Sequence, residues 1–176
     1  LIQLGEAHLL DGSPQRALES ADAAIEEGDK SGDALELRAR ALVALGQLNA
    51  ALSLRETLYA NPLSSLSRRL AIARSLSKKE FRDAAEAEFT SAVRLYSSES
   101  KAWIAYANWH SEQGDHDRAE AILRQALTAL PTAADVHAEI AAVFEEQGYL
   151  DLARQAYSHA LRLAPSREDY ADELAR

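Results

Sequence analysis

Glycine recurs at a fixed interval along this chain, and that spacing constrains the fold more than any other feature of the sequence. Gly12, Gly46, Gly114 and Gly148 fall on one grid of 34 residues, and the single grid point without glycine is Glu80. A small residue follows every grid point by five positions: Ala17, Ala51, Ala85, Ala119 and Ala153. A period of this length indicates a linear array of similar units rather than one globular core.

Each unit is predicted to be a pair of antiparallel helices. Apolar residues within 116–130 recur at intervals of three and four, which places them on one helix face: Ala119, Ile122, Leu123, Ala126, Leu127 and Leu130. Glycine ends the first helix because it adopts positive φ without a Cβ clash, and the small residue lets the second helix approach its partner. The helices are predicted to start at Ser13-Pro14 and at two capping-box variants, Thr132 with Asp135 and Ser166 with Asp169.

The repeat pattern resembles that of the tetratricopeptide repeat (TPR) family over essentially the whole chain. The fourth repeat matches it at Trp103, Gly114, Ala119, Ala126 and Pro131, and the fifth at Ile140, Phe144, Gly148, Ala153, Tyr157, Ala160 and Pro165. The third repeat departs from the pattern, with Arg69 in place of a bulky apolar residue and Glu80 in place of glycine.

The resemblance implies an all-α fold, a right-handed α-solenoid forming a single domain over 1–176. The repeats are expected at approximately 1–31, 32–65, 66–99, 100–133 and 134–167. Residues 168–176 are expected to be a capping helix or the start of a sixth repeat. The chain does not begin with Met, so we expect it to be a slice of a longer array.

The stretch Gly114–Glu120, GDHDRAE, gathers acids around a histidine and raises the question of a metal or catalytic site. Its place on the repeat grid predicts a turn instead, with Asp115 favouring the turn and Asp117 capping the next helix. The other histidines (His8, His110, His137 and His159) are scattered without metal-ligand spacing, and no phosphate-binding glycine motif is present. We therefore expect no catalytic residue, no metal, no cofactor and no enzyme activity.

Composition narrows the set of partners. The net charge is −9 with a pI near 5.0, which argues against nucleic-acid binding because an acidic surface repels phosphate. No apolar run is long enough to insert into a membrane, and the absence of cysteine is compatible with either periplasm or cytoplasm. Trp109 is predicted to be buried, and an exposed stacking platform is the alternative.

The TPR resemblance also indicates where a partner would bind. In this family the first helix of each repeat lines a concave groove through its second, fifth, sixth, ninth, twelfth and thirteenth positions. The ninth position gives Arg40, Arg74 and Asn108, and Lys78 and Lys101 lie nearby, which predicts a basic ladder for an acidic or carboxylate-ended segment. The alternative is that these are solvated charges on a helix face. Farther along, Asp135, Glu139, Glu145 and Glu146 are expected to make the groove acidic.

The predicted function is therefore a protein-interaction scaffold that holds a peptide, helix or subunit and organises a larger complex. A bacterial envelope or exopolysaccharide-export assembly is one such complex that the resemblance suggests. Two alternatives remain: a substrate-recruiting repeat domain of an enzyme such as a glycosyltransferase, and a module that self-associates through its end repeats.

Overall fold

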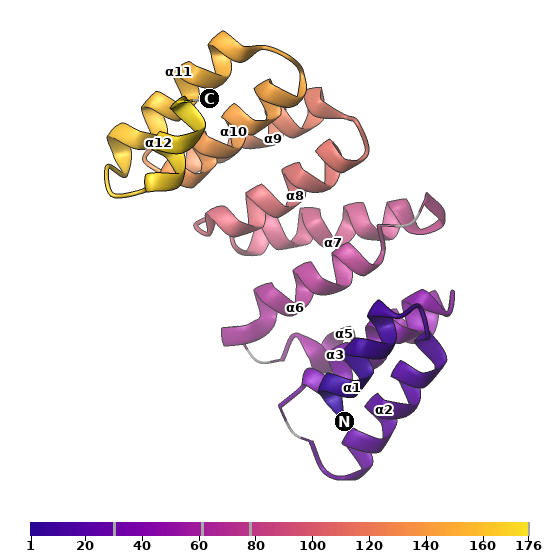
Figure 1. Cartoon of the computed structure of the whole chain (residues 1–176). Coiled ribbons are helices and arrows are strands. Elements are labelled where there is room, and N and C mark those ends of the chain that lie inside the picture. The colour runs from indigo at the N-terminus through magenta and orange to yellow at the C-terminus, as the bar shows by residue number, and fades with distance from the viewer. Residues whose placement is uncertain (30, 61, 78, 176) are drawn as a thin grey trace. The chain divides into compact units, whose positions relative to one another are not determined.

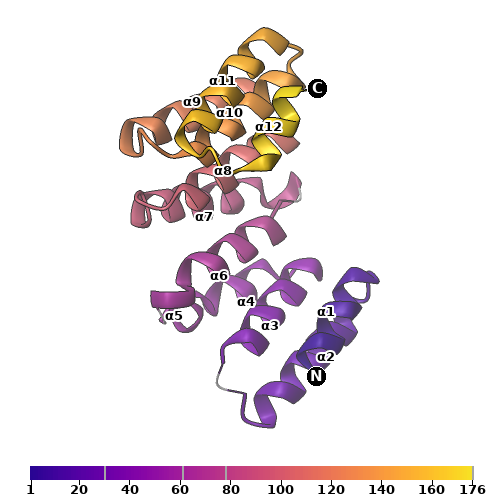
Figure 2. The ribbon, with the colours of Figure 1, turned by 60° about the vertical axis from the view of Figure 1, so that its left-hand side comes forward.

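The computed structural model describes residues 1–29, 31–60, 62–77 and 79–175, except for the side chains of residues 62–64, 79 and 175. Within these ranges it contains helices and no strand, so the predicted all-α fold is confirmed (Figures 1 and 2). The elements are α1 (Ile2–Leu10), α2 (Pro14–Glu26), α3 (Asp33–Ala44), α4 (Leu48–Ser53), α5 (Arg55–Leu58), α6 (Pro62–Ser75), η1 (Lys79–Phe81), α7 (Arg82–Leu95), α8 (Ser100–Glu112), α9 (His116–Ala129), α10 (Ala134–Glu146), α11 (Leu150–Leu163) and α12 (Glu168–Ala175).

The helices form two compact units, Leu1–Phe89 and Thr90–Arg176, and the division falls within α7. Unit 1 holds the helix pairs of the first two predicted repeats together with α6. Unit 2 holds the pairs α8/α9 and α10/α11, followed by α12.

Small side chains make the core of unit 1. Ala17 and Ala21 of α2 pack against Leu37 and Ala41 of α3, and all four are fully buried. Gly5 lets α1 pack closely against Leu37 of α3, because a Cβ at this position would lie 2.3 Å from Cδ2 of Leu37. The alanine-rich composition therefore serves close helix packing, as the sequence predicted.

The second repeat is irregular in the stretch from Gly46 to Pro62, which is one residue shorter than the corresponding stretch from Gly114 to Pro131. Its second helix is split into α4 and α5 at Leu54, whose N–H bonds to the carbonyl of Ala51, three residues back. The next helix, α6, begins at Pro62, a residue suited to the first helical position because it lacks an N–H. This start lies before residue 66, where the third repeat was expected to begin.

Aromatic residues fill unit 2. Trp103 is buried, and its Nε1 donates to the carbonyl of Ser97 at 2.9 Å. Trp109 is only 2% exposed and packs edge-on against His110, with 4.8 Å between ring centroids. The prediction that Trp109 is buried is therefore confirmed, and the stacking-platform alternative is wrong.

The turn predicted at the GDHDRAE stretch is present: Gly114 and Asp115 lie between α8 and α9, and the residues from His116 onward form the first turns of α9. Gly114 has φ of +77°, and the carboxylate of Asp115 accepts a hydrogen bond from the N–H of Arg118 at 3.3 Å. The N-cap is therefore Asp115 and not Asp117, which lies in the first turn of α9. An N-cap carboxylate satisfies one of the free N–H groups of that turn.

The other predicted caps are only partly present. Ser13 is the N-cap of α2 and Pro14 follows it, but the Ser13 side chain makes no capping hydrogen bond. The capping boxes are wrong: α10 begins at Ala134 with Ala133 as its N-cap, and α12 begins only at Glu168. Thr132 and Ser166 lie in the preceding turns, where they are too early to cap.

Candidate functional site

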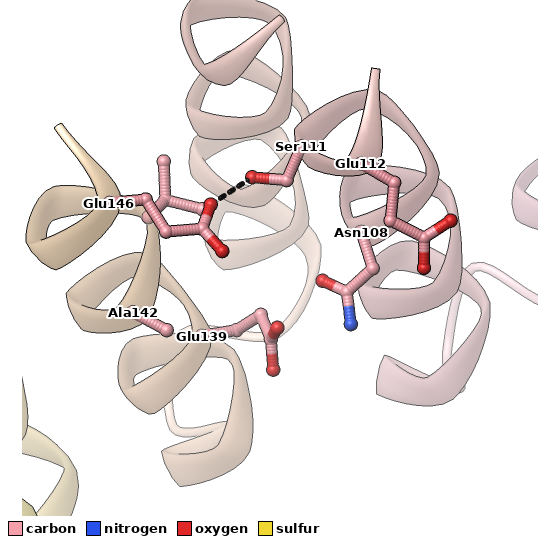
Figure 3. Close-up of a pocket in the computed structure, with 7 residues that line it drawn as sticks. Asn108, Ser111, Glu112, Glu139, Ala142 and Glu146 are labelled. Carbon is pink, nitrogen blue, oxygen red and sulfur yellow. Dashed lines mark hydrogen bonds between the residues drawn. The ribbon is translucent and has the colours of Figure 1, made fainter. Parts of the chain in front are cut away.

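The surface between α8 and α10 in unit 2 carries a polar hollow of about 220 Å³. Figure 3 shows α8 on one side and α10 on the other, with carboxylates from both helices around the gap. The residues that line it are Asn108, Ser111, Glu112, Glu139, Ala142, Val143 and Glu146. Below, these residues are called the α8–α10 hollow.

Helical spacing brings these side chains together. Asn108, Ser111 and Glu112 are three and four residues apart on α8, so they share one face. Six of the seven lining residues occupy the sixth, ninth, twelfth or thirteenth position of their repeats, counting from residues 100 and 134. Glu139 and Glu146 were predicted for the acidic part of the groove, whereas Asn108 was predicted to belong to the basic ladder and instead lies among carboxylates. Ser111 and Glu112 were not predicted, although their twelfth and thirteenth positions could have identified them.

Carboxylates dominate the electrostatics of the α8–α10 hollow. Burial raises the pKa of Glu139, and the neighbouring Glu146 and Asp135 raise it further. A side-chain hydrogen bond from Asn108 opposes the shift, because it stabilises the ionised carboxylate. A cation placed here would relieve this repulsion, so the hollow favours a positively charged group.

Two residues of the hollow, Ser111 and Glu146, contact each other and His116, which lies outside the lining. Ser111 Oγ donates to Glu146 Oε2, and His116 Nδ1 lies 3.0 Å from Ser111 Oγ and 3.1 Å from Glu146 Oε2. A catalytic triad needs one ring nitrogen on the nucleophile and the other on the carboxylate. Here both contacts use Nδ1, so the arrangement links α8 and the first residue of α9 to α10 and does not relay a proton.

The remaining predicted acidic residues point elsewhere. Glu145 accepts a hydrogen bond from the Tyr157 hydroxyl at 3.1 Å, so its carboxylate faces α11 and not the hollow. Asp135 accepts a hydrogen bond from Ser100, the first residue of α8. Both side chains therefore tie neighbouring helices together.

The predicted basic residues are not equally available. Arg40 Nη1 lies 2.7 Å from Glu6 Oε1 and 3.8 Å from Glu36 Oε1, so an intramolecular ion pair already occupies this guanidinium. Arg74, in the last turn of α6, and Lys101, in α8, are exposed. Lys78 lies outside the described residues.

Two histidines that the sequence left apart meet in unit 2. His137 of α10 and His159 of α11 have ring centroids 4.2 Å apart, so the prediction that the histidines are scattered is wrong for this pair. Burial lowers the pKa of His137, and a hydrogen bond involving the Pro131 carbonyl opposes that shift. Within the described ranges, no group of three or more His, Asp or Glu side chains is arranged to hold a metal ion.

Three models of the tetratricopeptide repeat family match the sequence, over residues 2–64, 100–143 and 134–167. Together they cover most of the chain, and they agree with the helix pairs and turn glycines described above. The protein belongs to the tetratricopeptide repeat family.

Solved structures of other TPR proteins are similar over nearly the full length. The thermophilic TPR protein TTC0263 of Thermus thermophilus is 25% identical, with 99% of this chain and 97% of that chain covered and a TM-score of 0.57. YrrB, described as a TPR protein with an unusual peptide-binding site, is 16% identical, with 99% and 90% covered and a TM-score of 0.55. MamA is 16% identical, with 94% and 97% covered and a TM-score of 0.53.

No curated protein sequence matches this chain. Of the helices in the described ranges, none combines the length and the apolar character needed to cross a membrane.

Proposed function

We propose that this protein is an interaction scaffold whose α8–α10 hollow receives a basic side chain from a protein or peptide partner. The observation that carries the proposal is the hollow itself, which is lined by Glu112, Glu139 and Glu146 together with Asn108. A lysine or arginine there would gain charge-assisted hydrogen bonds. The similarity to TPR proteins, one of which is described as having a peptide-binding site, supports the same class of function.

Two arginines of the predicted basic ladder, Arg40 and Arg74, lie in unit 1 and are proposed to bind an acidic segment. Within unit 1, Arg74 is exposed and suits an acidic segment of the partner, whereas Arg40 must first leave Glu6; Lys101 is exposed in unit 2. Arg74 is therefore expected to contribute more than Arg40.

The test measures binding of a lysine-containing peptide by fluorescence anisotropy. We expect Glu139→Gln with Glu146→Gln to weaken binding about tenfold and to flatten its salt dependence, because two charge-assisted contacts are lost. Glu145→Gln is the matched control, since this residue lies on the same helix but faces Tyr157. Equal loss in the control, or no loss in the double variant, would refute the role of the hollow.

The two arginines of the basic ladder are tested separately with an acidic peptide. Arg40→Ala together with Arg74→Ala should weaken its binding and reduce its salt dependence. Unchanged affinity and salt dependence would remove the acidic-segment proposal and leave the α8–α10 hollow unaffected.

The larger assembly is a finer proposal. The family resemblance suggests a bacterial envelope or exopolysaccharide-export complex, and a catalytic neighbour such as a glycosyltransferase domain is the alternative. Proteins cross-linked to the scaffold in its native cell would distinguish the two.

Self-association is a second candidate because Leu4 and Leu10 of α1 are 52% and 87% exposed. Sedimentation velocity should then show mass increasing with concentration, and a monomer throughout the range would exclude it.

A further inference from the structure

Arg69 is the departure from the repeat pattern that most needs a physical explanation. It stands where the family has a bulky apolar side chain, and its side chain is only 13% exposed. Burying a guanidinium costs free energy unless an anion compensates it. The compensating anion is Glu88 of α7, which is 2% exposed and has Oε2 at 3.4 Å from Arg69 Nη1.

Glu88 also holds a second guanidinium. Arg55 Nη1 donates to Glu88 Oε1 at 2.9 Å, and the Tyr59 hydroxyl donates to Oε2 at 3.1 Å. The guanidinium carbon of Arg69 lies 3.9 Å from the ring centroid of Tyr59, a cation–π contact. One carboxylate thus orients two arginines, and the cluster of Arg55, Arg69, Tyr59 and Glu88 carries one excess positive charge.

This cluster forms part of a second hollow, which lies wholly in unit 1. It opens beside α5 and α6 (labelled in Figure 2) and is lined by Leu52, Ser53, Arg55, Glu56, Tyr59 and Arg69. Glu88 is not among the lining residues, whereas the side chain of Arg55 is 45% exposed. The arginines therefore face the opening, and their shared counter-ion lies behind them.

We propose that this unit 1 hollow binds an oxyanion, the carboxylate or phosphate group of a ligand. Arg55 Nε donates to the Leu52 carbonyl at 3.1 Å and Nη1 donates to Glu88 Oε1, so these contacts fix the guanidinium before binding, and an oxyanion would bond to its remaining N–H groups. Leu52 and the Tyr59 ring give the hollow an apolar wall, which suits a carboxylate attached to an apolar body. A local violation of the repeat pattern that the fold compensates elsewhere is characteristic of a functional site.

The negative charge of Glu56 is expected to weaken binding of an anion in this hollow, and this expectation provides a second test. Glu56 lines the hollow and is exposed, so its carboxylate reduces the positive potential that the anion meets. Removing this charge is expected to strengthen binding, an effect that partial unfolding would not produce.

The experiment follows backbone amide resonances of the ¹⁵N-labelled protein at low salt. The probes are N-acetyl-leucine, its neutral amide, and inorganic phosphate. We expect N-acetyl-leucine or phosphate to shift the resonances of residues 52–59, and the neutral amide to leave them unchanged. Arg55→Gln should weaken binding about tenfold, as expected for a lost charge-assisted hydrogen bond. Glu56→Gln should strengthen it about threefold, a rim-charge effect.

Arg16→Gln is the matched control, because Arg16 is an exposed arginine of unit 1 outside this hollow. Binding by only one of the two anions supports the proposal and identifies the source of the oxyanion. Equal shifts with the neutral amide, no shift with either anion, or equal loss in the Arg16→Gln control would overturn it. The site is independent of the α8–α10 hollow, so its failure would leave the proposed function intact.

Discussion

The third and fourth repeats solve the same packing problem with opposite chemistry. Arg69 and Trp103 occupy one repeat position, 34 residues apart, and so do Glu88 and Ile122. In unit 2, Trp103 and Ile122 are buried apolar side chains, whereas in unit 1 the corresponding pair is an arginine and a buried glutamate in contact. This repeat position therefore requires a side chain of sufficient volume whose polar atoms have bonding partners, and it does not require an apolar side chain.

The fifth repeat adds a third solution. His137 stands at the position of Trp103, and its half-buried ring lies against His159. A histidine side chain is smaller than that of tryptophan and, unlike it, can take up a proton. The same position should therefore respond differently to truncation, to charge removal and to pH in the three repeats.

The largest change in stability is expected in the fourth repeat, where the position holds the apolar side chain of Trp103. Trp103→Ala should lower the free energy of unfolding by about 4 kcal/mol, because it leaves a cavity and removes a buried aromatic surface. Urea denaturation followed by far-UV circular dichroism measures this loss. Tyr149→Ala is the control, since that aromatic side chain is 57% exposed and should cost about 0.5 kcal/mol or less. Similar losses in both variants would contradict the buried role of Trp103.

The stability of the third repeat should be nearly as sensitive to the loss of one partner of the Arg69–Glu88 ion pair. Glu88→Ala should cost about 3 kcal/mol, because it leaves Arg69 buried without its counter-ion. Replacing both residues, as Arg69→Leu with Glu88→Leu, should recover most of that stability, to within about 1 kcal/mol of the parent. If the double variant is as unstable as the sum of the single ones, unit 1 does not tolerate the apolar solution and the comparison fails.

The smallest effect is a pH dependence in the fifth repeat. Burial lowers the pKa of His137 from its usual 6.5, and the neighbouring His159 ring lowers it further. Among the described contacts, Arg162 bonds to His159 Nδ1 and brings a positive charge to the pair. The folded state therefore binds the proton more weakly than the unfolded chain. Stability is fully present above pH 6.5 and falls as pH drops from there through the lowered folded-state pKa.

Comparison of the urea midpoints at pH 7.5 and pH 5 measures this effect. His137→Gln should reduce the difference between the two midpoints, whereas His8→Gln, a change far away in the sequence in α1, should not. The same pH dependence in the parent and in the His137→Gln variant would show that other groups cause it.

The local parts of the site could be predicted from the sequence. The repeat register assigned Asn108, Glu139 and Glu146 to one surface, and they line one hollow because positions along a helix fix which side chains share a face. The same register fails for Glu145, whose carboxylate turns to the Tyr157 hydroxyl. The residue spacing within one helix does not predict a side-chain conformation that depends on a hydrogen-bond partner in another helix.

The sequence by itself determined the helix pairs, the turn at Gly114 and the membership of the TPR family, because glycine conformation and helical periodicity are local properties. Only the tertiary structure decided which polar groups meet: His137 with His159, His116 with Glu146, and Glu88 with two arginines. These contacts join residues from different helices. Their energies depend on distance and burial in the folded chain, which the order of residues along one helix does not contain.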